Sequence, residues 1–192
     1  NMVKKQNGKL VIISSPSGGG KDSVIKALLK IFPNSTRLIT TTSRAPRPDQ
    51  KEGVDYYFIS PQEFQKKIED GKFVEYNFYA GNFYGTEKKI LEESLKNKDL
   101  VLTQIEVNGK HNFDKAKIPH LSIFLLPENL KFLKKRIKNR GGIPEELIKK
   151  RLEIAKEEIK QSNDYDEKII NYEGKLEETI KKVTKTIRNY LK

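Results

Sequence analysis

Two short stretches of the chain contain side chains that proteins use to bind phosphate groups. Residues 14–21 form a glycine-rich turn, Ser-Ser-Pro-Ser-Gly-Gly-Gly-Lys, directly after the apolar run at residues 10–13. Residues 40–48, Thr-Thr-Thr-Ser-Arg-Ala-Pro-Arg-Pro, place Arg44 and Arg47 three positions apart. Both stretches therefore point to ligands that carry phosphate.

The glycine-rich turn has the order of parts that a nucleotide phosphate loop needs. A buried strand delivers the chain to a fixed point, and glycines allow torsions and close approaches that a Cβ would block. Backbone N–H groups and the start of the following helix then attract anions, and Lys21 can reach the β- and γ-phosphates. The match to G-x-x-x-x-G-K-[ST] is imperfect, because Ser15 replaces the first glycine and Asp22 replaces the hydroxyl residue.

The arginine-rich stretch can hold a second phosphate group. Two guanidinium forks on a loop stiffened by Pro46 can make several charge-assisted hydrogen bonds to one phosphate. Arginines in loops are more often plain surface residues. The separate phosphate loop favours the binding interpretation, because an enzyme that transfers a phosphoryl group must hold both a donor and an acceptor.

Apolar runs and helical patterns alternate along the chain. Strand-length runs occur at residues 10–13, 100–105, 121–126 and 169–170, and helical patterns at 21–31, 86–97 and 128–140. Continuous apolar runs are typical of parallel strands buried on both faces. This alternation predicts an α/β core with a parallel sheet flanked by helices.

Residues 40–85 follow a different pattern. Alternation at Val54, Tyr56 and Phe58, and aromatic runs on both sides of the turn at residues 80–82, favour antiparallel strands. Between them, residues 60–63 (Ser-Pro-Gln-Glu) form a capping box that predicts the start of a helix. We expect a small β-rich lobe inserted into the core.

The C-terminal half contains three helical patterns. Residues 128–161 predict two helices joined by the Gly-Gly-Ile-Pro turn after Arg140. Residues 175–191 have apolar positions three and four apart, which is typical of a helix that packs on a core.

Composition limits the function classes. The chain has 192 residues, no cysteine and a formal net charge of +12. The charge is spread along the chain beside abundant glutamate, so we expect a solvated surface and no nucleic-acid partner. No apolar stretch approaches the roughly 20 residues of a membrane span. We therefore expect a cytoplasmic protein without a membrane partner, monomeric, with a dimer as the alternative.

The sequence resembles the guanylate kinase family from about residue 10 to residue 171. The resemblance rests on the phosphate loop, on Thr-Thr-Ser-Arg-Ala-Pro-Arg, Asp-Tyr-Tyr-Phe, Phe-Val-Glu-Tyr, Gly-Asn-Phe-Tyr-Gly-Thr and Lys-Lys-Arg-Ile-Lys-Asn-Arg-Gly, all in the family's order. It implies a P-loop NTPase core, an inserted β-rich GMP-binding lobe and a helical lid. In this single domain of residues 1–192 we expect the core at 1–39, 87–133 and 158–192, the lobe at 40–86 and the lid at 134–157.

The resemblance also implies an activity: transfer of the ATP γ-phosphoryl group to GMP or dGMP, with Mg²⁺ bound alongside ATP, giving ADP and GDP. The residues that it makes catalytic are Lys21, Arg44, Arg136, Arg140 and Arg151. Those that it places at ATP are Ser17, Gly18, Gly19, Gly20, Lys21, Asp22, Ser23, Arg136 and Asn171. Those that it places at GMP are Thr40, Arg44, Arg47, Tyr56, Glu75, Tyr84, Thr86 and Glu106. A carboxylate such as Glu75 can accept from both N1–H and the N2 amine of guanine, a donor pair that adenine lacks.

The chain departs from the family at two positions on the presumed metal side. Asp22 follows the phosphate-loop lysine, where serine or glycine is common, and Gln104 replaces the first acid of an acidic-x-Asp pair whose second position is Glu106. Our hypothesis is that Asp22, as a Mg²⁺ ligand, restores the charge that Gln104 removes. Two alternatives stay open: a catalytically silent module that binds phosphopeptides, and a kinase for another nucleoside monophosphate.

Overall fold

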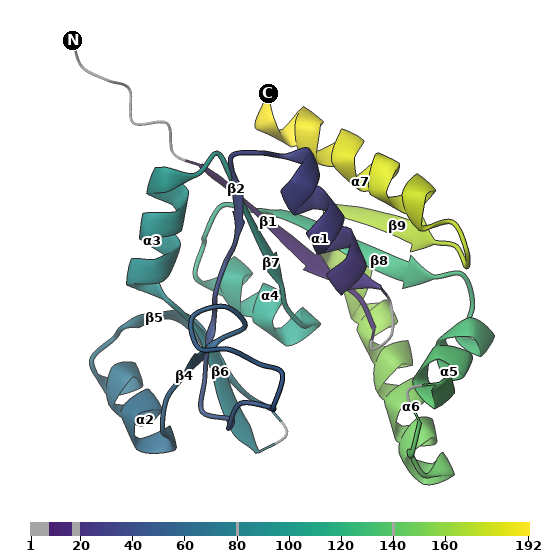
Figure 1. The fold of residues 1–192 in the computed structure, drawn as a ribbon, viewed down its shortest axis with the longest axis horizontal. Helices are drawn as coiled ribbons and strands as arrows, with labels where there is room; N and C mark the ends of the chain where they lie inside the picture. The colour runs from purple at the N-terminus through teal and green to yellow at the C-terminus, as the bar shows by residue number, and fades with distance from the viewer. Residues whose placement is uncertain (1–7, 17–19, 80, 140) are drawn as a thin grey trace. The chain divides into compact units, whose positions relative to one another are not determined.

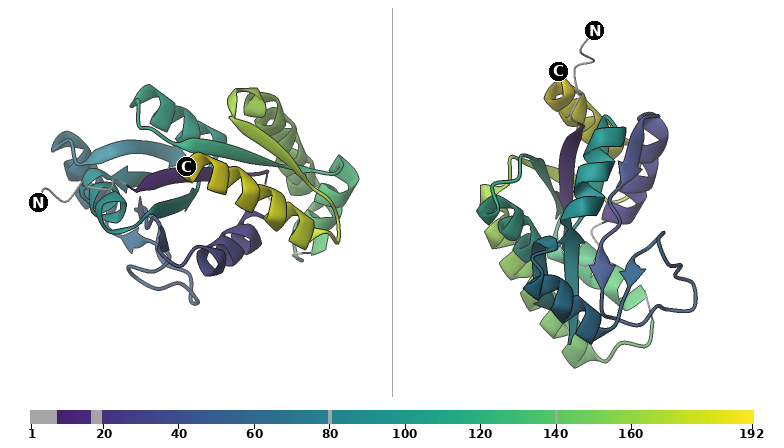
Figure 2. Two further views of the ribbon diagram at one scale, coloured as in Figure 1. Left: turned by 90° about the horizontal axis from the view of Figure 1, so that it is seen from above. Right: turned by 90° about the vertical axis from the view of Figure 1, so that its left-hand side faces the viewer.

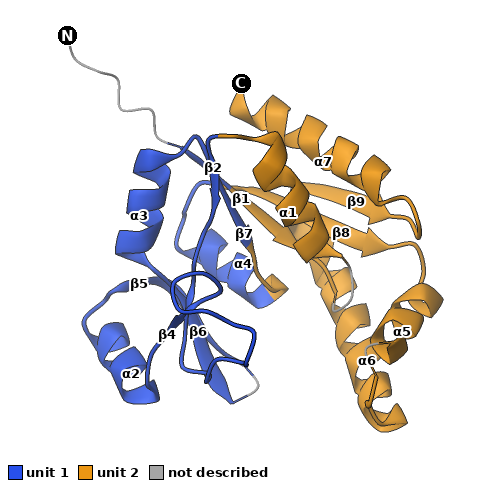
Figure 3. Cartoon of the chain, viewed as in Figure 1, with its two compact units in different colours: residues 1–10, 34–103, 108–119 blue, residues 11–33, 104–107, 120–192 orange. Residues whose placement is uncertain are grey.

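The structure is a computed structural model that describes residues 8–16, 20–79, 81–139 and 141–192. The chain forms two compact units, coloured separately in Figure 3. Unit 1 contains Asn1–Leu10, Asn34–Thr103 and Asn108–Pro119, and unit 2 contains Val11–Pro33, Gln104–Val107 and His120–Lys192.

Unit 2 is built on parallel strands. β1 (Lys9–Ser14) pairs with β8 (Leu121–Pro127), and β8 pairs with β9 (Glu167–Asn171), both in parallel. The apolar residues of β1 and β8 are almost fully buried, as continuous apolar runs between covering helices must be. Helix α7 (Leu176–Leu191) packs on β8, β9 and α1 (Lys21–Ile31) (Figures 1 and 2).

A helical hairpin follows β8 in the same unit. Helices α5 (Leu130–Asn139) and α6 (Glu145–Gln161) pack through an apolar cluster that includes Leu133, Ile137, Ile148 and Ala155. The turn between them contains two glycines at positive φ, where a side chain would strain the backbone. The 3₁₀ turn η1 (Ser162–Asp164) ends the hairpin.

Among its described residues, unit 1 contains a second group of strands and three helices. β2 (Ser35–Arg37) pairs in parallel with β7 (Leu100–Gln104). A four-stranded sheet has the order β4-β3-β6-β5, formed by Tyr57–Phe58, Thr41–Thr42, Asn82–Glu87 and Phe73–Tyr79. The helices are α2 (Pro61–Glu69), α3 (Lys88–Asn97) and α4 (Val107–Lys115), whose first residue belongs to unit 2.

An aromatic cluster supports the four-stranded sheet. The Phe64 ring of α2 is fully buried and stacks on Phe73 and Phe83, at centroid distances of 4.3 and 5.0 Å. The capping box that starts α2 is present, with Ser60 and Glu63 bonded to each other's backbone N–H. A Cβ at Gly85 would lie 2.8 Å from the Phe73 ring, so glycine allows the strand to approach this cluster.

The α/β class with parallel strands flanked by helices is confirmed, and α1 has the predicted bounds. The prediction of antiparallel strands is correct for β5 and β6 but wrong for β4, which runs parallel to β3 and has two residues. Val54 lies outside this strand and is 59% exposed, because residues 51–56 form a turn instead. The sequence patterns did not predict β2 or α4.

In the part of the chain that the structure describes, no helix combines the length and the apolar character needed to span a membrane. The predicted division into core, lobe and lid stays a prediction.

Candidate active site

The residues at the start of α1, which the sequence predicts to bind ATP, lie in unit 2. Gly20 precedes α1 with φ +86°, and a Cβ there would lie 2.8 Å from Nδ2 of Asn171. Lys21, the first helical residue, is partly buried. Ser17, Gly18 and Gly19, which the sequence predicts to bind phosphate, lie outside the described residues.

Asn171 lies next to Gly20 at the end of β9. Its side chain is 4% exposed, and Oδ1 accepts a hydrogen bond of 2.8 Å from Thr179 on α7. Asn171 also lines a small hollow with Pro127, Phe132 and Arg136. Asn171, which the sequence predicts to lie at ATP, is therefore close to Gly20 and borders a hollow of mixed apolar and charged lining.

Asp22 and Ser23 are exposed on the first turn of α1. An acidic side chain there also suits the positive end of the helix dipole, so Asp22 has a structural role without any metal. The described residues contain no group of three metal-ligating side chains. Mg²⁺ usually takes one or two protein oxygens together with substrate phosphates and water, so no such group is required.

Gln104 ends β7 with its Oε1 atom buried and without a hydrogen-bond partner among the described residues. An unsatisfied buried oxygen is uncommon and suits a ligand or a bound water. The donor set of Asp22, Gln104 and Glu106 consists of oxygens, which is the chemistry that Mg²⁺ prefers. The residues present therefore fit a magnesium ion that arrives with ATP.

Two carboxyl groups in unit 2 have a raised pKa that the charge of Lys21 partly lowers. Burial raises the pKa of Glu106, and the charge of Lys21 opposes the shift. Burial likewise raises the pKa of Glu158 on α6 to about 7, and again Lys21 lowers it while Glu106 raises it further. Perturbed carboxyl groups beside a cation are common in functional sites.

The predicted lid arginines lie on α5 and α6. Arg136 Nη2 and Nε donate to Glu173 Oε2 at 2.7 and 3.1 Å, which connects α5 to the loop after β9. Glu145, at the start of α6, forms ion pairs with Lys134 and Lys138 of α5. Arg151 is partly buried on α6, and Arg140 lies outside the described residues.

The residues predicted to hold the GMP phosphate include a group of aromatic and arginine side chains in unit 1. The Arg44 guanidinium lies over the Tyr56 ring, with Cζ 5.6 Å from the centroid, and the Tyr56 and Tyr84 rings meet edge to face at 6.1 Å. Gln50 Oε1 accepts from Arg44 Nη2 at 2.8 Å and from the Arg47 backbone N–H at 3.2 Å. Gln50 thus orients the arginine loop.

Glu75 and Thr86 form a buried polar pair across β5 and β6. They occupy paired positions in the antiparallel ladder, with exposures of 8% and 0%. Thr86 Oγ1 donates to Glu75 Oε1 at 2.9 Å. This hydrogen bond orients the carboxylate, which has further acceptor capacity.

Thr40 and Arg47 complete the predicted set in unit 1. The Thr40 carbonyl accepts from Tyr57 N–H at 2.9 Å just before β3 begins. The Arg47 side chain is exposed and has no hydrogen bond or ion pair within the described residues, so it can meet an incoming anion. Glu106, predicted to contact the same ligand, belongs to unit 2.

Sequence reasoning missed three residues of these groups: Gln50, Glu158 and Glu173. Gln50 lies three positions after Arg47, in the turn where its side chain can reach back to the loop, so its position was a signal. Glu158 and Glu173 are ordinary acidic residues in a charged region, and no local pattern separates them from their neighbours.

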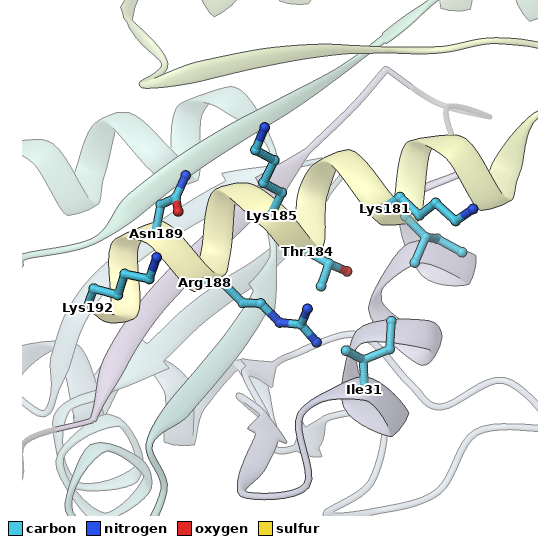
Figure 4. A pocket seen from close by; sticks show the side chains of 8 residues that line it. Ile31, Lys181, Thr184, Lys185, Arg188, Asn189 and Lys192 are labelled. Atoms are coloured by element: carbon cyan, nitrogen blue, oxygen red, sulfur yellow. The ribbon is translucent and has the colours of Figure 1, made fainter.

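Two larger hollows contain none of the predicted site residues. One, of about 450 Å³, lies between Ile31 and the α7 face that carries Thr184 and Arg188 (Figure 4). Ile31 ends α1, roughly 15 Å from Lys21 at a rise of 1.5 Å per residue. The other, of about 720 Å³, is lined by charged residues of α2 and α3.

Comparison with known proteins gives one family. The guanylate kinase family model matches residues 7–190. The guanylate kinase of Prochlorococcus marinus (strain MIT 9312) is 42% identical over 185 residues, covering 96% of this chain and 99% of the relative. That of Rickettsia bellii (strain RML369-C) is 41% identical over 169 residues, covering 88% of each. The crystal structure of guanylate kinase from Anaplasma phagocytophilum superposes with a TM-score of 0.76 at 30% identity, over 97% of this chain and 88% of that chain.

Proposed function

Because the chain belongs to the guanylate kinase family, we propose that it transfers the γ-phosphoryl group of ATP to GMP and releases ADP and GDP. Family membership rests on a match over nearly the whole chain and on relatives of similar length. The chain is thus an ATP:GMP phosphotransferase of the nucleoside monophosphate kinase type.

The observation that carries the choice of acceptor is the buried Glu75–Thr86 pair. Guanine presents N1–H and the N2 amine side by side, and a fixed carboxylate accepts from both. Adenine cannot supply this pair, so it would leave the buried carboxylate without those partners, at a cost of roughly 1–3 kcal/mol or more. The 2.9 Å hydrogen bond from Thr86 fixes the carboxylate before the base arrives.

We propose that residues 40–86 hold GMP, with Arg44, Arg47, Tyr56 and Tyr84 at its phosphate. The cation–π contact and the hydrogen bond to Gln50 hold the Arg44 guanidinium in one orientation. Nη1 also donates to the Ala45 carbonyl, and the remaining N–H donors of a guanidinium held in this way can bind phosphate oxygens with little loss of side-chain freedom. Thr40 and Glu106 complete this proposed acceptor set.

We propose that ATP binds through residues 17–23, with Lys21 at its phosphates and Asn171 and Arg136 beside the nucleotide. Charge spreads over the equatorial oxygens of the transferring group in the transition state, and the cations Lys21, Arg136, Arg140 and Arg151 stabilise it there. In this proposal residues 134–157 act as the lid, whose closure excludes water that would hydrolyse ATP.

We propose that Mg²⁺ binds together with ATP. Asp22 and the Gln104 oxygen would hold the ion, and when bound it neutralises charge on the β- and γ-phosphates. The cytoplasmic location and the monomeric state stay predictions of the sequence.

The test is an acceptor panel with ATP and Mg²⁺. GMP and dGMP are offered beside AMP and UMP, and each diphosphate is separated and measured. We expect GDP and dGDP to form at rates at least 100-fold above ADP from AMP or UDP from UMP. A preference for AMP or UMP would refute the acceptor assignment, and no diphosphate from any acceptor would favour the silent binding module.

A further inference from the structure

A hollow of about 450 Å³ opens between the C-terminal parts of α1 and α7 (Figure 4). Both helices belong to unit 2 and pack on each other. Ile31, at the end of α1, and Ile180 of α7 form part of its wall. Small-molecule sites in proteins usually have volumes of about 300–1,000 Å³, so this hollow is large enough for a small organic ligand.

Thr184 lines the hollow and has a buried hydroxyl without a partner. The residue is 7% exposed, and its Oγ1 atom makes no hydrogen bond within the described residues. Two other threonines of α7 do have partners: Thr186 Oγ1 donates to the Lys182 carbonyl at 3.1 Å, and Thr179 Oγ1 donates to Asn171 Oδ1 at 2.8 Å. A buried hydroxyl without a partner is uncommon and costly, and a ligand that reaches it removes the cost.

Arg188 places a guanidinium beside this hydroxyl. It follows Thr184 by four residues, so the two side chains share one face of the helix. Figure 4 shows both side chains extending from α7 toward Ile31. The Arg188 Cζ atom lies 5.9 Å from the centroid of the Phe32 ring, and the guanidinium forms no ion pair or hydrogen bond within the described residues. The ring orients the guanidinium, and its forked donors can meet an anion.

Three lysines make the edge of the hollow positive. Lys181, Lys185 and Lys192 line it, and no ion pair joins any of them to a carboxylate of the described residues. Cations near the C-terminal end of a helix also suit its dipole, so their charge alone does not indicate a ligand. Together with the hollow and the unpartnered hydroxyl, the charge favours an anionic ligand over a neutral one.

We propose that this hollow is a second ligand site, which binds a phosphate monoester of a small organic molecule. The phosphate oxygens accept from the Arg188 guanidinium and from the Thr184 hydroxyl, and the apolar remainder of the ligand lies against Ile31 and Ile180. Threonine in a helix has two accessible rotamers, so the hydroxyl can turn toward the phosphate. The site goes beyond the proposed phosphoryl transfer, because it lies roughly 15 Å from Lys21 along α1.

The binding experiment uses phenyl phosphate, a monoester with a planar apolar group. Backbone N–H signals of the isotope-labelled full chain are followed by NMR while the probe is added at constant ionic strength. We expect the signals of Ile31, Thr184 and Arg188 to shift together with one dissociation constant of about 1 mM or lower, which is ordinary for a ligand of this size. Shifts confined to Gly20 and Lys21 would place the probe at the phosphate loop alone and overturn the proposal.

Two further probes separate the sources of binding. Inorganic phosphate lacks the ring and should bind at the hollow about threefold more weakly or less tightly still, because it leaves the apolar wall uncovered. Benzyl alcohol lacks the charge and should not shift the same signals. If inorganic phosphate binds as tightly as phenyl phosphate, the assignment to a monoester is wrong. If benzyl alcohol binds as tightly, the anionic character of the site is wrong.

Matched variants on α7 test the two polar groups. Arg188→Gln is paired with Lys182→Gln, which also removes one positive charge, and Thr184→Val is paired with Thr186→Val, which also removes one hydroxyl. We expect Arg188→Gln to weaken the binding of phenyl phosphate about 10-fold or more and Thr184→Val about fivefold, with both controls within about twofold of the wild type. Equal weakening by Arg188→Gln and Lys182→Gln would reveal a general attraction to a positive surface and contradict a defined site.

Unfolding in urea without ligand shows whether the Thr184 hydroxyl serves the fold instead. Valine has nearly the same shape, so replacing a hydroxyl that has no partner should leave the unfolding midpoint of Thr184→Val equal to or above that of the wild type. Thr179→Val loses the hydrogen bond to Asn171 and should have a lower midpoint. A midpoint of Thr184→Val as low as that of Thr179→Val would assign the hydroxyl a structural role. None of these measurements uses turnover, so they decide the second site whether or not the chain phosphorylates GMP.

Discussion

Replacing Gly20 by alanine tests the close approach of the phosphate loop to β9. Gly20 has φ +86°, a conformation that costs an L-residue about 1–2 kcal/mol. The new Cβ would lie 2.8 Å from Asn171 Nδ2, closer than van der Waals contact allows. Asn171 must therefore move, although Thr179 holds its Oδ1 atom at 2.8 Å in a buried position.

The expected loss of stability follows from these two costs. The hydrogen bond between Thr179 and Asn171 is worth about 1 kcal/mol, and its disruption adds to the backbone strain. We expect Gly20→Ala to lower the free energy of unfolding by about 2–3 kcal/mol. Equilibrium unfolding in urea, monitored by circular dichroism without nucleotide, measures it.

Gly174→Ala is the matched control in the same unit. Gly174 has φ +71° and no atom within 4 Å of the position of a Cβ, so alanine there brings strain without a clash. We expect Gly20→Ala to lower the free energy of unfolding by about 1 kcal/mol more than Gly174→Ala does. This difference should shrink when Thr179→Val removes the hydrogen bond that holds Asn171. Equal losses for the two glycine variants would refute the close approach.

Three further predictions concern the carboxylates and the metal side. The amide of Glu75→Gln cannot accept from both guanine donors, so kcat/KM for GMP should fall about 10- to 100-fold in the acceptor panel. The low rate with AMP should stay unchanged. An equal loss for GMP and AMP would contradict the guanine contact. Burial raises the pKa of Glu158 from an ordinary 4.5 to about 7, so its contribution to stability is full below pH 4.5 and lost as pH rises through 7. Glu158→Gln should therefore be more stable than the wild type at pH 8, by about 1–2 kcal/mol after discounting for solvent screening, and nearly equal to it at pH 5; urea unfolding at both values shows whether this difference exists. The hypothesis that Asp22 restores the charge lost at Gln104 is tested with Asp22→Ser, Gln104→Asp and the double variant, by measuring how GDP formation depends on Mg²⁺. We expect the double variant to recover activity that Asp22→Ser loses. If the effects of the two single changes simply add, the two positions do not compensate each other.

Short-range sequence patterns predicted most of the buried strands and the starts of two helices. The apolar runs became β1, β7 and β8, because continuous apolar segments can be buried on both faces only within a covered sheet. The shorter run at residues 169–170 lies in β9, where Ile169 is buried and Ile170 is exposed. The capping box began α2, and Lys21 begins α1 directly after Gly20 at positive φ. The family motifs also identified the Glu75–Thr86 pair, which the β5–β6 register brings together.

Long-range pairing decided what the patterns could not. β4 pairs in parallel with Thr41 and Thr42 of β3. A two-residue segment has no directional preference of its own, so its sequence could not predict this direction. The sequence of α4 includes glycine and asparagine, which are poor helix formers. Burial of Phe113 stabilises α4 through its surroundings, and the ion pair of Lys110 with Asp114 joins successive turns of the helix itself.

The sequence by itself therefore determined the chemistry: a phosphate loop with its lysine, an arginine loop and a carboxylate suited to guanine. Only the tertiary structure decided which partners hold these groups. Arg136 pairs with Glu173, and Arg44 lies between Gln50 and Tyr56. Residue types and short spacings are encoded locally, whereas the partners of a side chain also come from other segments of the chain, as Glu173 does for Arg136.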